Sequence, residues 1–216
     1  MQHGRVLLDL FTQRDFFSRE GSCYSVASGR AARNVRRMFR WSRSESIPVI
    51  STLLRTRCGE PSPMAAVPHC VDGTWGEGKL RGTVLPRHIN FGLRNIAHLM
   101  PDVFESYQQA IFEMRHTDIF SHRRIERLLT ELDGATFFLL GAGVAHGIFQ
   151  AAMGLRARKA AVVLARDAVA ALPDPAAGPR AIRLDAKGVV FATTAEIIAP
   201  RPHARPRHRL RRKQPI

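Results

Sequence analysis

The sequence lacks any long apolar run. In its 216 residues, no stretch approaches the roughly 18 consecutive apolar residues that a helix needs to cross a bilayer. The N-terminal segment MQHGRVLLDL carries Asp9 where a signal peptide would keep its apolar core. We therefore expect no membrane partner and a cytoplasmic location.

Cysteine is scarce. The three cysteines, Cys23, Cys58 and Cys70, are an odd number at spacings that fit neither a disulfide framework nor a paired zinc site. His69 precedes Cys70, but adjacent side chains rarely face each other, so we do not expect a cysteine–histidine pair. The pattern predicts reduced thiols.

Acidic residues are too few to balance the basic ones. The formal net charge is +15, and the last sixteen residues, RPHARPRHRLRRKQPI, hold six Arg, one Lys and no acid. This segment has almost no apolar side chains, so we expect residues 201–216 to be a disordered basic tail after a single domain at 1–200. Nucleic-acid binding through 201–216 is an alternative. We favour a solvated extension because no aromatic residue is available to stack on bases.

A second basic cluster lies in SGRAARNVRRMFRWSRSES. Arg30, Arg33, Arg37 and Arg40 recur at helical spacing, which indicates an amphipathic helix with an arginine face. We expect Ser28 to cap this helix and the helix to end before Pro48. The arginine face is expected to be solvated.

Apolar segments alternate with helical patterns along the chain. Strands are expected at 5–11, 47–54, 109–115, 135–141, 160–166 and 188–194. Strands apolar on both faces and separated by helices indicate a parallel sheet. We therefore predict a three-layer, Rossmann-like α/β fold with about six parallel strands and helices on both faces. Residues 57–106 would form a long connection with a helical turn near HINFGLRNIAHLM, and LPDPAAGPR would be the last loop.

A glycine-rich turn follows the fourth expected strand. GAGVAHG has glycines at 141, 143 and 147, at the sheet edge where ligands bind in such folds. The spacing is not that of a dinucleotide fingerprint, and the turn does not open the domain. We expect no cofactor.

The order of these segments, over residues 4–198, resembles the isochorismatase-like hydrolases. The similar pieces are VLLDLFTQRDFF, IPVISTLL, HCVDGTWGEGKL and GAGVAHG with the following LRARKAAVVLARDAV. The resemblance implies a six-stranded parallel sheet and frequent dimers or tetramers, so we expect a homo-oligomer.

The resemblance also implies a catalytic triad of aspartate, lysine and cysteine. Asp9 matches the family aspartate position, whereas the lysine position falls on Met114 and the cysteine position on Phe149. Arg115 is cationic but neighbours Met114, and adjacent strand residues point to opposite faces. His146 is a further candidate acid or base.

The turn itself is retained, with Gly143, Val144 and Ala145 able to hold an oxyanion as the resemblance implies. Family members that act as nicotinamidases bind zinc through an aspartate and histidines after the second strand. Here that place reads STLLRTRC, so we expect no metal.

Three hypotheses remain open. We favour an isochorismatase-like protein that lacks cysteine-dependent hydrolase activity and acts as a binding or assembly protein, with a small-molecule ligand as a candidate occupant of the cleft. Met114 and Phe149 would then fill the old site. The alternative is an active hydrolase of an amide, imide or vinyl ether, which needs Asp9, His146 and a cation in one cleft.

The third hypothesis is a nucleic-acid accessory protein. It requires the arginine helix and the basic tail at 201–216 to form one surface. Whether the chain is an enzyme at all is left open by the sequence.

Overall fold

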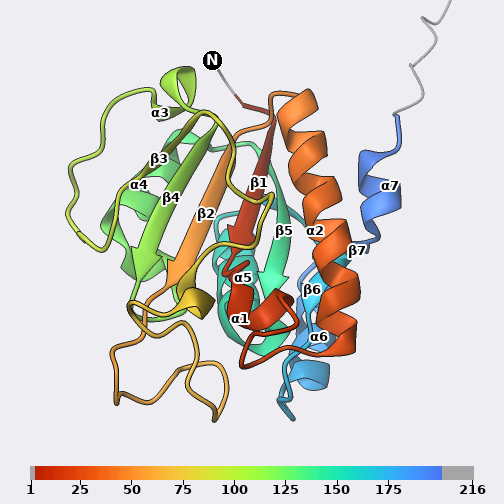
Figure 1. Ribbon diagram of the computed structural model, residues 1–216. Helices are drawn as coiled ribbons and strands as arrows, with labels where there is room; N and C mark the ends of the chain where they lie inside the picture. Colours follow the sequence, from red (N-terminus) through yellow and green to blue (C-terminus); the bar gives the residue numbers. More distant parts are fainter. Residues whose placement is uncertain (1–2, 201–216) are drawn as a thin grey trace, which may run out of the picture.

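The fold is built on a seven-stranded, entirely parallel sheet with helices on both faces (Figure 1). The computed structural model describes residues 3–200. The strand order is β3-β4-β2-β1-β5-β6-β7. The strands are β1 (Arg5–Leu10), β2 (Val49–Leu54), β3 (His88–Asn90), β4 (Gln109–Met114), β5 (Thr136–Ala142), β6 (Ala161–Ala170) and β7 (Val190–Ala192). The predicted parallel α/β fold is confirmed, with one more strand than expected.

The helices form a layer on each side of the sheet. The longer ones are α2 (Val26–Ser44), α4 (Arg123–Glu131), α5 (Phe149–Ala157) and α6 (Ala177–Ala186), and the short ones are α1 (Arg14–Phe17), α3 (Val103–Ser106) and α7 (Thr194–Ile198). In Figure 1, α2 and α7 lie side by side in front of the sheet, whereas α4 and α5 lie behind it. Both faces of the central strands are therefore covered, and every residue of β2 is buried.

Helix α2 is amphipathic, as the spacing of its apolar residues predicts. Its buried face includes Ala31, Val35, Met38 and Phe39. The predicted cap was wrong by one turn. Ser25 is the N-cap and accepts a hydrogen bond from the backbone N–H of Ser28 at 3.1 Å, while the Ser28 hydroxyl accepts one from the Ser25 N–H at 2.8 Å.

This reciprocal arrangement is a capping box, which satisfies two otherwise unpaired donors. The helix ends at Ser44, before Pro48 as expected.

Two local expectations were wrong. The segment HINFGLRNIAHLM holds no helical turn. Instead, its first residues form the edge strand β3, which pairs with β4. The loop predicted at LPDPAAGPR contains the start of α6, because Pro179 lies in the first turn of that helix, where a missing N–H costs nothing.

Within residues 3–200, no helix is long and apolar enough to cross a membrane. The tail expected at 201–216 lies outside the described residues.

Candidate functional site

Asp9 lies in the middle of the sheet and has no exposed surface. Its Oδ2 atom accepts a hydrogen bond from the Ser51 hydroxyl at 2.6 Å and another from the Lys79 ammonium. Its Oδ1 atom is buried and has no hydrogen-bond partner among the described residues. The carboxylate is therefore held by an ion pair with Lys79 that the sequence analysis missed.

Asp9 and Lys79 belong to a closed ring of hydrogen bonds that joins six polar residues. The ammonium of Lys79 also donates to Thr12 Oγ1 at 2.5 Å, and Thr12 Oγ1 donates to Thr83 Oγ1 at 3.5 Å. Gln109 Nε2 closes the ring by donating to Ser51 Oγ at 2.8 Å and to the Thr83 carbonyl at 3.0 Å. We call Asp9, Thr12, Ser51, Lys79, Thr83 and Gln109 the polar ring.

Burial dominates the electrostatics of Lys79. It lowers the pKa of the ammonium, while the charge of Asp9 opposes that shift. The ring of Phe39 on α2 lies 6.0 Å from Nζ. The pair thus sits between the sheet and α2, in an environment that penalises a lone charge.

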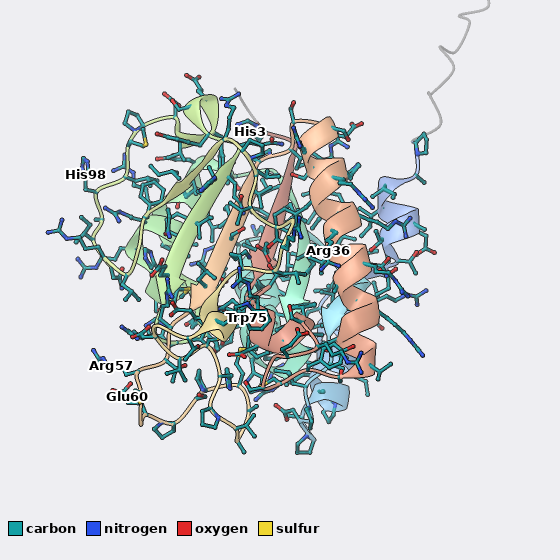
Figure 2. All side chains as sticks on the ribbon, viewed as in Figure 1. His3, Arg36, Arg57, Glu60, Trp75 and His98 are labelled. Atoms are coloured by element: carbon teal, nitrogen blue, oxygen red, sulfur yellow. The ribbon has the colours of Figure 1, made fainter. Side chains whose placement is uncertain are left out.

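The long connection after β2 delivers Lys79 to this position. The backbone N–H of Leu80 donates to the Thr12 carbonyl at 2.9 Å, beside an antiparallel bridge between Gln13 and Lys79. The Gln13 amide donates to the carbonyls of Leu54 and Glu77, each at 2.8 Å. The connection is therefore fixed to the ends of β1 and β2, with Trp75 lying beside α1 (Figure 2).

The structure does not bring Met114 to Asp9. In the strand register, Asp9 pairs with Ser51, and Ser51 pairs with Ile111. Met114 is three residues beyond Ile111, which is about 10 Å along the strand and an odd number of steps. The two side chains thus point to opposite faces of the sheet, and Met114 is buried.

The glycine turn follows β5 and interrupts the entry to α5. Gly141 and Gly143 have φ values of 141° and 67°, which favour glycine. In the short segment η3 (Val144–Ile148), the backbone kinks at His146, whose φ of −116° and ψ of −121° are not helical. The turn at Gly143, Val144 and Ala145 is thus a distinct backbone feature rather than a plain helix start.

Apolar side chains pack tightly against this turn. A Cβ atom at Gly147 would lie 2.5 Å from Cε2 of Phe11, and one at Gly143 would lie 2.8 Å from Cε of Met64 and 3.1 Å from Cδ1 of Leu172. A methyl group at Gly147 would therefore clash with the Phe11 ring, and one at Gly143 would require the end of the Met64 side chain to shift.

Phe149 starts α5 and is half-buried. Its ring lies 5.4 Å from the guanidinium carbon of Arg180 and 5.7 Å from that of Arg183, both on α6. These distances suit cation–π contacts. The residue at the position of the family nucleophile therefore packs against the neighbouring helix.

The other two candidate groups have ionic partners of their own. His146 Nε2 lies 3.2 Å from Asp174 Oδ2, and burial lowers the pKa of its ring although Asp174 opposes this. Arg115 Nη1 donates to Asp72 Oδ2 at 2.6 Å. Asp9, His146 and Arg115 thus have three separate acidic or basic partners, Lys79, Asp174 and Asp72.

The cysteines do not supply a thiolate at the turn. Cys70 is buried, and burial raises the pKa of its thiol well above the usual value. Its backbone N–H donates to Asp15 Oδ2 at 2.6 Å, while Nδ1 of His69 is 2.9 Å from the Val67 carbonyl. Within residues 3–200, no group of three metal-ligating side chains is assembled.

The signal for Lys79 was present in the sequence but incomplete. An aspartate inside an otherwise apolar strand requires a buried partner, because a lone carboxylate is costly there. The sequence could not identify which distant cation supplies it, since Lys79 lies 70 residues away in an irregular connection.

Comparisons with known proteins place the fold. The sequence matches no protein-family model and no curated protein. An isochorismatase family protein from Desulfovibrio vulgaris superposes with a TM-score of 0.67 at 15% identity, covering 91% of this chain and 97% of that one. The nicotinamidase/pyrazinamidase of Bacillus subtilis gives 0.66 at 14% identity, with coverages of 89% and 100%.

N-carbamoylsarcosine amidase from Thermoplasma acidophilum gives a TM-score of 0.64 at 16% identity, covering 90% of this chain and 97% of that one. The chain therefore has the fold of the isochorismatase-like hydrolases.

Proposed function

We propose that this chain is an isochorismatase-like protein without cysteine-dependent hydrolase activity that acts as a binding or assembly protein. The observation that carries the proposal is the entry to α5. Phe149 packs there on Arg180 and Arg183, and Phe11, Met64 and Leu172 pack against the glycine turn.

Cysteine-dependent hydrolysis needs a thiolate at a helix N-terminus and a nearby cation to stabilise it. Phe149 offers neither a nucleophile nor a proton. Lys79 is bound to Asp9 and Thr12, on the sheet face opposite that of Met114. Lys79 therefore pairs with Asp9 and does not stabilise a thiolate at the start of α5, where Phe149 stands.

A rearranged hydrolase that uses Asp9 with His146 or Arg115 has less support. Asp9 is fully buried. The ring of His146 lies 3.2 Å from Asp174, and Arg115 binds Asp72. A general base needs a nitrogen free to take a proton from water or substrate.

The test is hydrolysis of nicotinamide, N-carbamoylsarcosine, isochorismate and a cyclic imide, with an active nicotinamidase as positive control. We expect no turnover by the native protein or by a variant carrying Cys23→Ser, Cys58→Ser and Cys70→Ala. Turnover that this variant loses would overturn the proposal. Turnover that it keeps would instead support a rearranged site.

If the turnover is kept, His146→Gln tests the rearranged site, because it removes the imidazole ring that lies 3.2 Å from Asp174. Asp9→Asn is unsuited as an activity probe, since a buried ion pair is broken and the fold itself is weakened.

Assembly is tested separately by light scattering. A homo-oligomer at micromolar concentration is expected for an assembly role. A strict monomer that also binds no member of the substrate panel, as judged by thermal shift, would argue against both parts of the proposed role.

A further inference from the structure

The exposed side of α2 carries a row of arginines that have no ionic partner within residues 3–200. The helix contains six arginines and no acidic residue. Arg30, Arg33, Arg40 and Arg43 are exposed, and Arg37 is half-buried. We call these five residues the arginine face.

Some arginines elsewhere in the described residues have carboxylate partners. Arg55, Arg115, Arg127 and Arg158 each form an ion pair with a carboxylate. No ion pair among residues 3–200 includes a member of the arginine face. Unbalanced positive charge in one row favours an anionic partner.

Carboxylates close to α2 are engaged elsewhere. Glu45, just beyond the end of the helix, pairs with Arg5 at 3.3 Å. Glu196 on α7 accepts hydrogen bonds from the backbone N–H and the hydroxyl of Thr193 at 2.6 and 2.8 Å. Asp167 accepts from Thr194 at 2.7 and 2.8 Å.

The arginine face is mounted on a rigid support. The apolar side of α2 is buried in the core, and Asn34 ties the helix to β6 by donating to the Asp167 carbonyl at 2.9 Å. At 1.5 Å per residue, Arg30 and Arg40 are about 15 Å apart along the axis. Several arginines can therefore contact one extended polyanion together.

Further positive charge adjoins the helix. Arg166 on β6 is exposed, and β6 packs against α2. Helix α7 also packs against α2 (Figure 1), and the sequence after it holds seven basic residues at 201–216. The chain thus leaves the described domain next to the arginine face.

We propose that the arginine face of α2 binds the phosphate backbone of a nucleic-acid duplex. A membrane surface fits less well, because an interfacial helix needs a free apolar face, and that face of α2 is buried. A single strand also fits less well, because base stacking needs exposed aromatics. Phe39 is buried and Trp41 packs on Phe138.

The test measures the Kd of the full-length protein for 20-base-pair RNA and DNA duplexes by fluorescence anisotropy between 50 and 200 mM salt. The test variant is Arg33→Gln with Arg40→Gln. The matched control is Arg57→Gln with Arg127→Gln, which removes the same charge from arginines paired with Glu60 and Glu131. Figure 2 shows Arg57 and Glu60 on a loop far from Arg36 of α2.

Loss of two phosphate contacts should lower the slope of log Kd against log salt by about 1.8, and weaken binding by about tenfold or more at the lower salt. The control should change Kd by less than about twofold. Duplexes of different base sequence should bind alike, since backbone contacts carry no sequence information.

Four results would overturn the proposal. One is the absence of duplex binding, and another is an equal loss in the test and control variants, which would indicate bulk charge. The third is tighter binding to vesicles of anionic phospholipid that compete with the duplex. A variant with Arg211→Gln, Arg212→Gln and Lys213→Gln tests the contribution of residues 201–216. If duplex binding is weakened in this variant but not in Arg33→Gln with Arg40→Gln, the α2 site is refuted as well.

Discussion

Replacement of Lys79 by methionine should destabilise the protein strongly. The side chain is of similar length, so Lys79→Met removes the charge with little change in volume. Asp9, with no exposed surface, would keep only the Ser51 hydroxyl on Oδ2, while Oδ1 already has no partner. Breaking a buried pair from one side costs about 3–5 kcal/mol.

The magnitude can be checked by chemical unfolding. For a chain of this size, about 1 kcal/mol corresponds to roughly 2–4 °C in Tm, so Lys79→Met should lower Tm by about 6–20 °C. Urea unfolding followed by circular dichroism gives the free energy directly, provided that the m-value is unchanged. Arg57→Met is the control, because its pair with Glu60 is exposed and should be worth less than about 1 kcal/mol.

The double variant decides whether the loss comes from the pair. Asp9→Asn combined with Lys79→Met leaves no buried charge, so it should be less destabilised than the sum of the single changes by about 2 kcal/mol or more. If the single changes cost under 1 kcal/mol, or if their effects simply add, the reasoning about a buried ion pair is refuted.

Three further predictions concern the core and its titrating groups. Burial, with a smaller effect of Arg124, lowers the pKa of His122 from 6.5 to about 4. The stability of the native protein should therefore fall as the pH drops from 6.5 to 4, by up to about 3 kcal/mol more than that of His122→Leu. The same pH dependence of the unfolding free energy in both proteins, measured with urea, would contradict this. Gly147→Ala should cost about 1–3 kcal/mol through its clash with Phe11, whereas Gly178→Ala, with nothing within 4 Å, should cost nothing; equal Tm values would refute the packing argument. The pKa of Glu113 is lowered, because hydrogen bonds from Arg55 and Asn90 outweigh the opposing effect of partial burial. Glu113→Gln should therefore cost about 1 kcal/mol of stability at pH 7, and progressively less below pH 4.5 as the carboxyl of the native protein is protonated. A cost that is the same at pH 3 and pH 7 would exclude this.

The sequence predicted the sheet because its signals are local. Buried strands such as Val49–Leu54 appear as apolar runs, and α2 appears as a 3.6-residue period. The edge strand His88–Asn90 was missed because it is three residues long and mostly exposed. Its position depends on pairing with β4, which no local pattern encodes.

The site was less predictable than the fold. Asp9, Met114 and Phe149 could be named from their places in the chain, but their relative orientation depends on strand register, which sets the face to which each side chain points. The contact of His146 with Asp174 and the ion pair of Arg115 with Asp72 join distant segments. Their formation follows from the tertiary structure alone.

The polar ring also affects how the molecule opens. It joins Thr83 and Lys79 of the long connection to strands β1, β2 and β4. Separation of residues 79–83 from the sheet would leave both the Asp9 carboxylate and the Lys79 ammonium without their charged partner. We therefore expect this segment to open only in global unfolding. Amide exchange there should be as slow as in the central strands, although the segment has almost no regular secondary structure. Residues 57–63 lie outside the ring, and most are exposed. A protease should therefore cut the connection near its start and leave its second half attached to the sheet.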